Sequence, residues 1–203
     1  MSLESSAQFV DPAVSRTKFQ REVEQYRRME DEYIKRGWWL LKAEFPEIFL
    51  IFGTPALRPP TVVFGAIVDF TNYDLWAPSV KLVDPFTRIP YRYQELPTRL
   101  PRATRRRILL QAGSDAEPVE ILQEQHLDLM QAHAPGDVPF LCFQGVREYH
   151  DHPAHSGDSW LLYRGQDMGT VYHILDVLYR YGVVPIKYRI NMNVGYQVTE
   201  VPE

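Results

Sequence analysis

The sequence predicts a single α+β domain with an N-terminal helix, an antiparallel meander sheet and later helices. Three observations support this fold class: residues 19–34 and 169–181 repeat apolar side chains at helical spacing, and residues 38–70 form aromatic and β-branched runs separated by turns. The chain has 203 residues, of which 45% are hydrophobic and 24% charged, enough for one hydrophobic core.

The first helix follows an N-terminal segment without periodicity. We expect residues 1–14 to be flexible and residues 15–203 to form the domain. From Phe19 onward the apolar residues lie at helical spacing, with charged and amide residues on the other faces. Gly37 is a suitable end for this helix, because glycine adopts the left-handed conformation common at helix ends.

Three segments rich in aromatic and β-branched residues come next, Trp38–Phe45, Ile48–Phe52 and Thr61–Phe70. Turn residues, including several prolines, separate them, so we expect an antiparallel meander of three strands. Residues 72–85 continue in an extended pattern. Pro78 has no backbone N–H to donate, which indicates an edge strand or a crossing segment there.

Residues 86–135 are interpreted as an insertion into the domain. Five arginines crowd a short stretch between prolines: Arg99, Arg102, Arg105, Arg106 and Arg107. Such a patch can bind nucleic acid, but no second patch or stacking-aromatic motif lies beside it, so we favour a solvated loop or helix start. Apolar spacing then predicts a second helix over Pro118–His133.

The C-terminal third contains the remaining predicted elements. We expect strands at Val138–Val146 and Trp160–Tyr163. A third helix is expected at Gly169–Tyr181, ended by Gly182, and strand structure at Val184–Val198.

Composition excludes several classes of protein. The single cysteine, Cys142, cannot form an intrachain disulfide, so a disulfide-stapled secreted fold is excluded. The net charge of −4 gives no overall attraction to nucleic acid or anionic lipid. The N-terminus lacks an apolar signal region, and no apolar run is long enough to span a bilayer. We therefore expect a cytoplasmic protein with no nucleic-acid or membrane partner.

Residues 140–160 hold the only cysteine and three of the six histidines. Thiolate, imidazole and carboxylate are the ligand types that zinc accepts, usually four in a tetrahedron. In an extended segment alternate side chains share a face, which would group four of these donors, and turns at Pro153 and Gly157 would bring His155 back to them. The candidate zinc ligands are Cys142, Glu148, His150, His152 and His155.

These five donors exceed the four positions of a tetrahedral site, so one of them need not contact the metal. Asp151 and Asp158 are candidates for holding the outer nitrogen of a ligating histidine. Two other interpretations remain: surface histidines beside a buried cysteine, and a nucleophilic Cys142 with a histidine base. We favour the metal, because a thiol in the apolar run Val138–Phe143 would have a raised pKa and low reactivity.

The pattern Cys142…Glu148…His155, continued by Gly157-Asp158-x-Trp160, resembles a bacterial family of predicted metal-binding proteins named for a Cys-Glu-His-His signature. That family is found beside bacterial ubiquitin-like conjugation genes. The resemblance implies that Cys142, Glu148 and two of the three histidines bind the metal. It also implies partners: a ubiquitin-like modifier, or its activating or conjugating proteins.

The order of elements is also similar to the ubiquitin-conjugating (UBC-like) fold. His152-Pro153 matches the start of that fold's His-Pro-Asn motif, but Ala154 replaces the asparagine. The catalytic cysteine of that fold would fall within residues 159–163, where this chain has none. Together the two resemblances imply a zinc-stabilised, non-catalytic adaptor of UBC-like fold in a bacterial ubiquitin-like conjugation pathway.

Two enzymatic alternatives stay open. A zinc ion with three protein ligands would keep a bound water for hydrolysis of ubiquitin-like conjugates, with Glu148 as general base. A divergent conjugating enzyme would instead carry the modifier as an ester on Ser159 or a thioester on Cys142.

Overall fold

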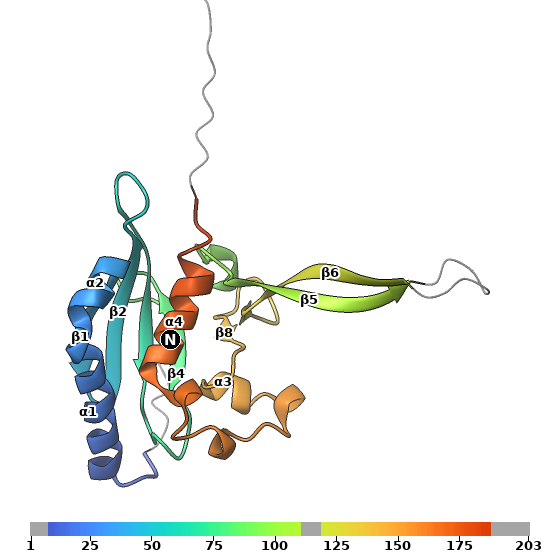
Figure 1. Cartoon of the computed structure of the whole chain (residues 1–203). Helices are drawn as coiled ribbons and strands as arrows, with labels where there is room; N and C mark the ends of the chain where they lie inside the picture. Colours follow the sequence, from blue (N-terminus) through green and yellow to red (C-terminus); the bar gives the residue numbers. More distant parts are fainter. Residues whose placement is uncertain (1–7, 111–118, 188–203) are drawn as a thin grey trace, which may run out of the picture.

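The computed structural model describes residues 8–110 and 119–187. Figure 1 shows a body of sheet and helices from which a two-stranded arm projects. The α+β class is confirmed, because an N-terminal helix precedes an antiparallel four-stranded meander and further helices follow.

The N-terminal helical region consists of two helices, α1 (Pro12–Arg28) and α2 (Glu30–Arg36). The Asp11 carboxylate accepts the Ala13 N–H at 2.8 Å and proline occupies the first helical position, so α1 begins inside the segment expected to be flexible. The predicted stop at Gly37 is confirmed: its φ is 89°, in the left-handed region.

The central sheet is antiparallel and contains four strands in chain order: β1 (Trp38–Glu44), β2 (Glu47–Thr54), β3 (Thr61–Asp69) and β4 (Ser79–Val83). The three predicted strands of the meander are confirmed. The fourth strand directly follows Pro78 and lies at the edge of the sheet, where a residue without an N–H donor removes no ladder bond.

The hydrophobic core lies between one face of this sheet and the helices. Leu50, Phe52 and Phe64 from the central strands are fully buried. The third predicted helix is confirmed as α4 (Val171–Gly182), which crosses the sheet in Figure 1 and contributes the buried Ile174 and Leu178. This packing fixes α1, the sheet and α4 relative to one another.

The helix predicted over Pro118–His133 is wrong, and so is the solvated loop before it. Among the described residues of this region, β5 (Pro101–Leu110) pairs antiparallel with β6 (Val119–Asp128), and these two strands form the arm. Arg107 Nε lies 3.2 Å from Glu120 Oε1, and Arg105 stands opposite Glu124. Cross-strand pairs of opposite charge favour the ribbon over the weak helical spacing of the apolar residues.

The predicted strand at Trp160–Tyr163 is also wrong, because Trp160–Leu162 form a short 3-10 helix, η3. Ser159 begins this turn by accepting the Leu161 N–H at 3.3 Å, and Leu161 and Leu162 are exposed. The strand predicted at Val138–Val146 shortens to β8 (Phe140–Leu141), which pairs with β7 (Met130–Gln131).

The remaining short helices are η1 (Tyr93–Glu95), α3 (Arg147–His150), η2 (Pro153–His155) and η4 (Asp167–Gly169). Of the strand predicted at Val184–Val198, residues 184–187 are not strand, and residues 188–198 lie outside the described residues. Within the described ranges no helix is both long and apolar enough to cross a membrane.

Candidate functional site

The histidine-rich segment forms a lobe of short helices and loops beside the edge strand β4 (Figure 1). Its first residues are fastened to the body of the protein. The Cys142 N–H donates to the Leu129 carbonyl at 2.7 Å, and the Arg147 N–H donates to the Pro78 carbonyl at 2.8 Å. The Arg147 guanidinium donates to the Thr71 carbonyl at 2.7 Å. The lobe therefore has a defined position on the sheet edge.

The expectation that this segment is extended is wrong, because residues 147–150 form the helical turn α3. Side chains two residues apart then point in different directions, so parity does not group the candidate ligands. A helical turn instead directs Glu148 to strand β4, where it finds hydrogen-bond donors. Each candidate ligand accordingly has its own surroundings.

Glu148 fastens α3 to the edge strand. One carboxylate oxygen accepts the Ser79 hydroxyl hydrogen bond, and the other accepts the Val80 N–H at 3.4 Å. Burial raises the pKa of Glu148 above its ordinary value, and the hydrogen bond from Ser79 opposes that rise. In this arrangement the carboxylate is engaged with β4.

His150 uses both ring nitrogens in hydrogen bonds to the backbone. Nδ1 lies 2.7 Å from the Asp158 carbonyl oxygen, which only accepts, so Nδ1 carries the proton. Nε2 accepts the Gly145 N–H at 3.2 Å. A neutral imidazole bonded in this way has no free lone pair for a metal. His150 instead connects the backbone at Gly145 to the backbone at Asp158.

Cys142 and His155 are brought together from positions 13 residues apart, with Sγ 3.6 Å from Nε2. The His155 ring stacks on Tyr149, with centroids 3.9 Å apart and planes at 21°. Burial raises the pKa of the Cys142 thiol, and the nearby Arg102 acts in the opposite direction. The pair is half-buried, so a small ion could reach it.

His152 lies next to this pair. Its ring centroid is 5.8 Å from that of His155 and 5.6 Å from that of Phe140, on which it stacks. Nδ1 accepts the Ala154 N–H at 3.2 Å, which leaves Nε2 as the nitrogen suited to a metal. Asp151, proposed to support a ligand, is exposed.

Asp158 is the centre of a hydrogen-bond network behind the pair. Its carboxylate accepts hydrogen bonds from the Tyr149 hydroxyl at 2.6 Å, from Gln144 Nε2 at 2.9 Å and from the Tyr163 hydroxyl. These bonds lower the pKa of Asp158 to about 2. Desolvation, and after it the hydrogen bond to Asp158, raise the pKa of Tyr149 to about 12. The histidine that Asp158 holds is His150, through its backbone carbonyl.

The fit to zinc is partial in this arrangement. Zn–S and Zn–N bonds of about 2.3 and 2.0–2.1 Å at a tetrahedral angle separate sulfur from nitrogen by about 3.5 Å. The Cys142–His155 separation of 3.6 Å matches that value. Across the described ranges, however, no three Cys, His, Asp or Glu side chains are grouped so as to hold a metal ion. A third ligand would require a side-chain movement, with His152 the nearest histidine to the pair by ring contact.

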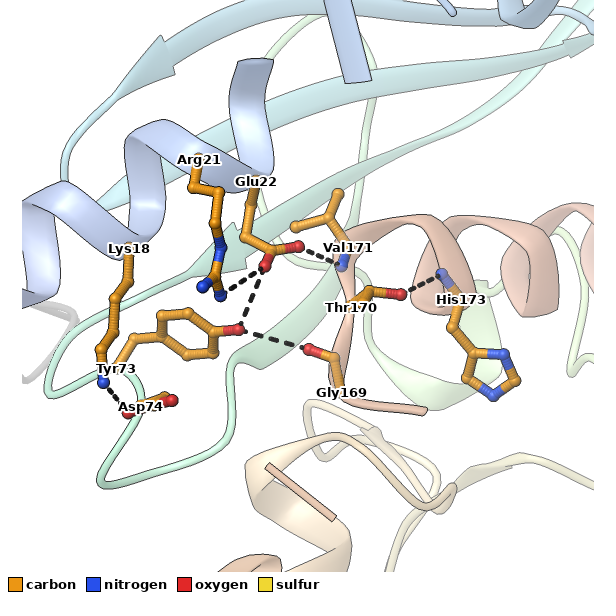
Figure 2. Close-up of polar contacts among 9 residues, drawn as sticks. All are labelled: Lys18, Arg21, Glu22, Tyr73, Asp74, Gly169, Thr170, Val171 and His173. Carbon is orange, nitrogen blue, oxygen red and sulfur yellow. Dashed lines mark hydrogen bonds and ion pairs between the residues drawn. The ribbon is translucent and has the colours of Figure 1, made fainter. Parts of the chain in front are cut away.

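A second polar cluster joins the N-terminal helix to α4 (Figure 2). Glu22 is 3% exposed, and one of its carboxylate oxygens accepts the Val171 N–H at 3.1 Å. The other lies 3.5 Å from the Tyr73 hydroxyl and 3.4 Å from Arg21 Nη2. Burial and the Glu22 charge raise the pKa of Tyr73. Glu22 thus satisfies the first N–H of α4 from another helix.

This cluster was not predicted from the sequence, although the sequence contains a signal for it. Glu22 lies between Phe19 and Tyr26 on the buried stripe of α1, where a charged residue is unusual unless it is paired. A polar hollow of about 290 Å³ lies beside it and is lined by Arg21, Tyr73 and Gln166 among others. The partners of Glu22 come from distant parts of the chain.

Comparison with known proteins identifies the family. The model of the Y4jH family, described as Y4jH-like, matches residues 10–186. A Sinorhizobium fredii protein, uncharacterized protein y4jH of strain NGR234, is 43% identical over 182 residues, which is 88% of this chain and 86% of that protein. The match includes the sheet, the lobe and α4. The chain belongs to the Y4jH-like family.

Proposed function

We propose that this protein is a zinc-binding accessory protein of a bacterial ubiquitin-like conjugation pathway. The observation that carries the proposal is the Cys142–His155 pair. Its Sγ–Nε2 distance of 3.6 Å suits two ligands of one tetrahedral zinc ion, for which about 3.5 Å is expected. The thiol has a raised pKa, so binding of zinc would release its proton and couple metal affinity to pH.

In this proposal His152 supplies the third ligand through Nε2. The other predicted ligands take supporting roles. Glu148 holds α3 against β4, and His150 ties Gly145 to Asp158, so both fix the backbone that carries the ligands. Groups behind the ligands commonly change metal affinity tenfold or more when they are removed.

The accessory role rests on the sequence resemblances and is supported by the surroundings of the cysteine. Cys142 is half-buried with a raised pKa, unlike an activated nucleophile, which needs a lowered one. The fold has the element order expected from the UBC-like resemblance up to β4, but no cysteine stands at residues 159–163. Because neither observation suits a catalytic cysteine, we propose that the protein acts by binding a modifier or a conjugating partner.

A zinc-dependent hydrolase is the second candidate, because three protein ligands leave one position for water. That mechanism assigned Glu148 as general base. The carboxylate of Glu148 is hydrogen-bonded to Ser79 and Val80 instead, which favours the accessory role.

The test is zinc content measured by plasma mass spectrometry on protein purified without a polyhistidine tag. We expect about one zinc per chain in the wild type and a loss in Cys142→Ser and His155→Ala. His126→Ala, on the exposed arm, is the matched control and should retain zinc. A wild-type protein that takes up no zinc when it is supplied would remove the proposal.

The pathway is tested separately by calorimetry with a purified bacterial ubiquitin-like modifier and its activating enzyme. We expect one of them to bind the zinc-loaded wild type. Binding of neither would contradict the accessory role while leaving the metal site intact.

A further inference from the structure

The arm that projects from the body is a ribbon of two strands with opposite charges (Figure 1). The sequence of β5 contains four arginines and no acidic residue, whereas β6 contains three acidic residues and neither lysine nor arginine. The side chains of Arg102, Arg105 and Arg107 are exposed. The arm therefore presents a cationic strand and an anionic strand, each along its own edge.

The outer edge of β5 is open among the described residues. β5 pairs with β6 alone, so alternate residues of β5 turn their N–H and C=O groups away from β6. An edge of this kind is a template for another strand. Two strands alone are marginally stable in water, and three or more with a shared apolar face are usually needed. The arm is thus suited to accept one further strand.

Charge indicates what kind of strand β5 accepts. Two copies of this chain related by a twofold axis would pair β5 with β5 or β6 with β6. Either pairing places like charges beside one another, which destabilises a sheet. β5 already pairs with an acidic strand, since Arg107 Nε lies 3.2 Å from Glu120 Oε1 and Arg105 stands opposite Glu124. A second acidic strand on the outer edge would meet the same arginines from the other side.

The register also indicates how the side chains of such a strand would be arranged. Residues directly opposite each other share a face, so one face of the arm, the charged face, carries the acidic residues of β6 together with Arg105 and Arg107. The other face has no carboxylate among the described residues and carries apolar side chains, among them Ile108, Ile121 and Leu127. Ile121 is 36% and Leu127 43% exposed. A strand with acidic residues on one face and apolar residues on the other would match both faces.

We propose that the outer edge of β5 binds an extended acidic segment of a partner protein as a third strand of the arm. Backbone hydrogen bonds to β5 supply affinity, and the alternate side chains supply specificity. The acidic side chains lie beside Arg105 and Arg107, and the apolar side chains extend the face that carries Ile108 and Ile121. The proposal uses none of the candidate zinc ligands, so it does not depend on the proposed function.

The test uses a fluorescein-labelled peptide of the length of β5 in which glutamate alternates with valine. We expect the full-length wild type to raise its fluorescence anisotropy, with an affinity that falls as salt is added, because exposed charge pairs are screened. Arg105→Gln/Arg107→Gln should bind the peptide at least about fivefold more weakly. Arg27→Gln/Arg28→Gln, at exposed positions of α1, removes the same charge and should bind it as the wild type does.

Glu120→Gln/Glu124→Gln separates binding from the stability of the arm. It breaks the same cross-strand contacts but keeps the arginines, so we expect it to bind the peptide at least as tightly as the wild type. A peptide with prolines at two successive central positions lacks backbone donors and should bind more weakly. Saturation with the original peptide should slow amide hydrogen exchange in β5.

Failure of the wild type to bind the peptide, or equal affinities of the wild type and Arg105→Gln/Arg107→Gln, would overturn the proposal. Equally tight binding of a peptide with lysine in place of glutamate would also overturn it. Binding of duplex DNA but not of the peptide would assign the arginines to nucleic acid instead. A dimer seen by light scattering and lost in Arg105→Gln/Arg107→Gln would assign the edge of β5 to a second copy, which equally contradicts the proposal.

Discussion

The two polar clusters of this protein differ in how completely their hydrogen-bonding groups are used. Around Glu22, both carboxylate oxygens of a fully buried side chain have partners from α1, the Tyr73 loop and α4. In the lobe, Cys142 and His155 are half-buried and contact each other, and His152 lies beside them with Nε2 free to bind a metal. The first arrangement joins elements, and the second keeps donors available for a ligand.

Charge and burial alone therefore do not identify a functional site. Glu22 is more buried than Cys142, His152 or His155, yet its contacts show that it connects two helices. His150 shows the same within the lobe, since its two ring nitrogens are engaged with the backbone. Three substitutions test this distinction between a structural contact and an available ligand.

Glu22→Ala should have the largest effect. It removes the acceptor of the buried Val171 N–H and of the Tyr73 hydroxyl, so we expect the free energy of unfolding to fall by about 3 kcal/mol. Urea denaturation measures this change. Glu24→Ala, exposed on the same helix, is the control and should change it by less than about 0.5 kcal/mol. Equal effects of the two substitutions would show that the cluster does not join α1 to α4.

His150→Ala should come second. It leaves the Gly145 N–H and the Asp158 carbonyl without their partner, so we expect a loss of about 1–2 kcal/mol in urea denaturation. Zinc should still bind at the same stoichiometry but about tenfold more weakly by competition with a chelator. His155→Ala should show the reverse pattern, with the zinc lost. Complete loss of zinc in His150→Ala would instead make His150 a ligand.

Glu148→Gln should have the smallest effect, and a pH-dependent one. Burial raises the pKa of Glu148 in the folded protein, so the fold binds this proton more tightly than the unfolded chain does. Its contribution to stability is therefore full below the unfolded pKa and is lost as pH rises through the folded pKa. We therefore expect the free energy of unfolding of Glu148→Gln, relative to that of the wild type, to increase as pH rises above the ordinary pKa of glutamate.

Urea denaturation at several pH values measures the difference between the two proteins. Asp151→Asn, at an exposed position of the same lobe, controls for removal of a charge. A difference that shrinks as pH rises would contradict the raised pKa of Glu148.

The sequence predicted the elements whose residues satisfy one pattern only. The strands β1 to β3 are bounded by turn residues, and α4 has an apolar stripe ended by glycine, so both were found. The β6 segment carries apolar residues at spacings that suit a helix or a strand. Only its pairing with the arginine-rich β5 decides between them, and that pairing is not local.

The candidate site was predicted in part for a similar reason. Residue types and proximity pointed to Cys142 and His155, which the structure brings together. The role of His150 depends on the backbone groups of Gly145 and Asp158, which every residue possesses, so no residue pattern reveals it. The zinc ligand set stays a prediction.

The contact between Glu22 and α4 also constrains when the fold can be completed during synthesis of the chain. Val171 follows Glu22 by 149 residues, so at 5–20 residues per second a ribosome needs about 7 to 30 s to make the intervening chain. During that interval the carboxylate of α1 has no helix terminus to bind. The fold can therefore be completed only after α4 has left the ribosome. In a nascent chain that stops before α4, the Glu22 carboxylate would lack its contact with the Val171 N–H.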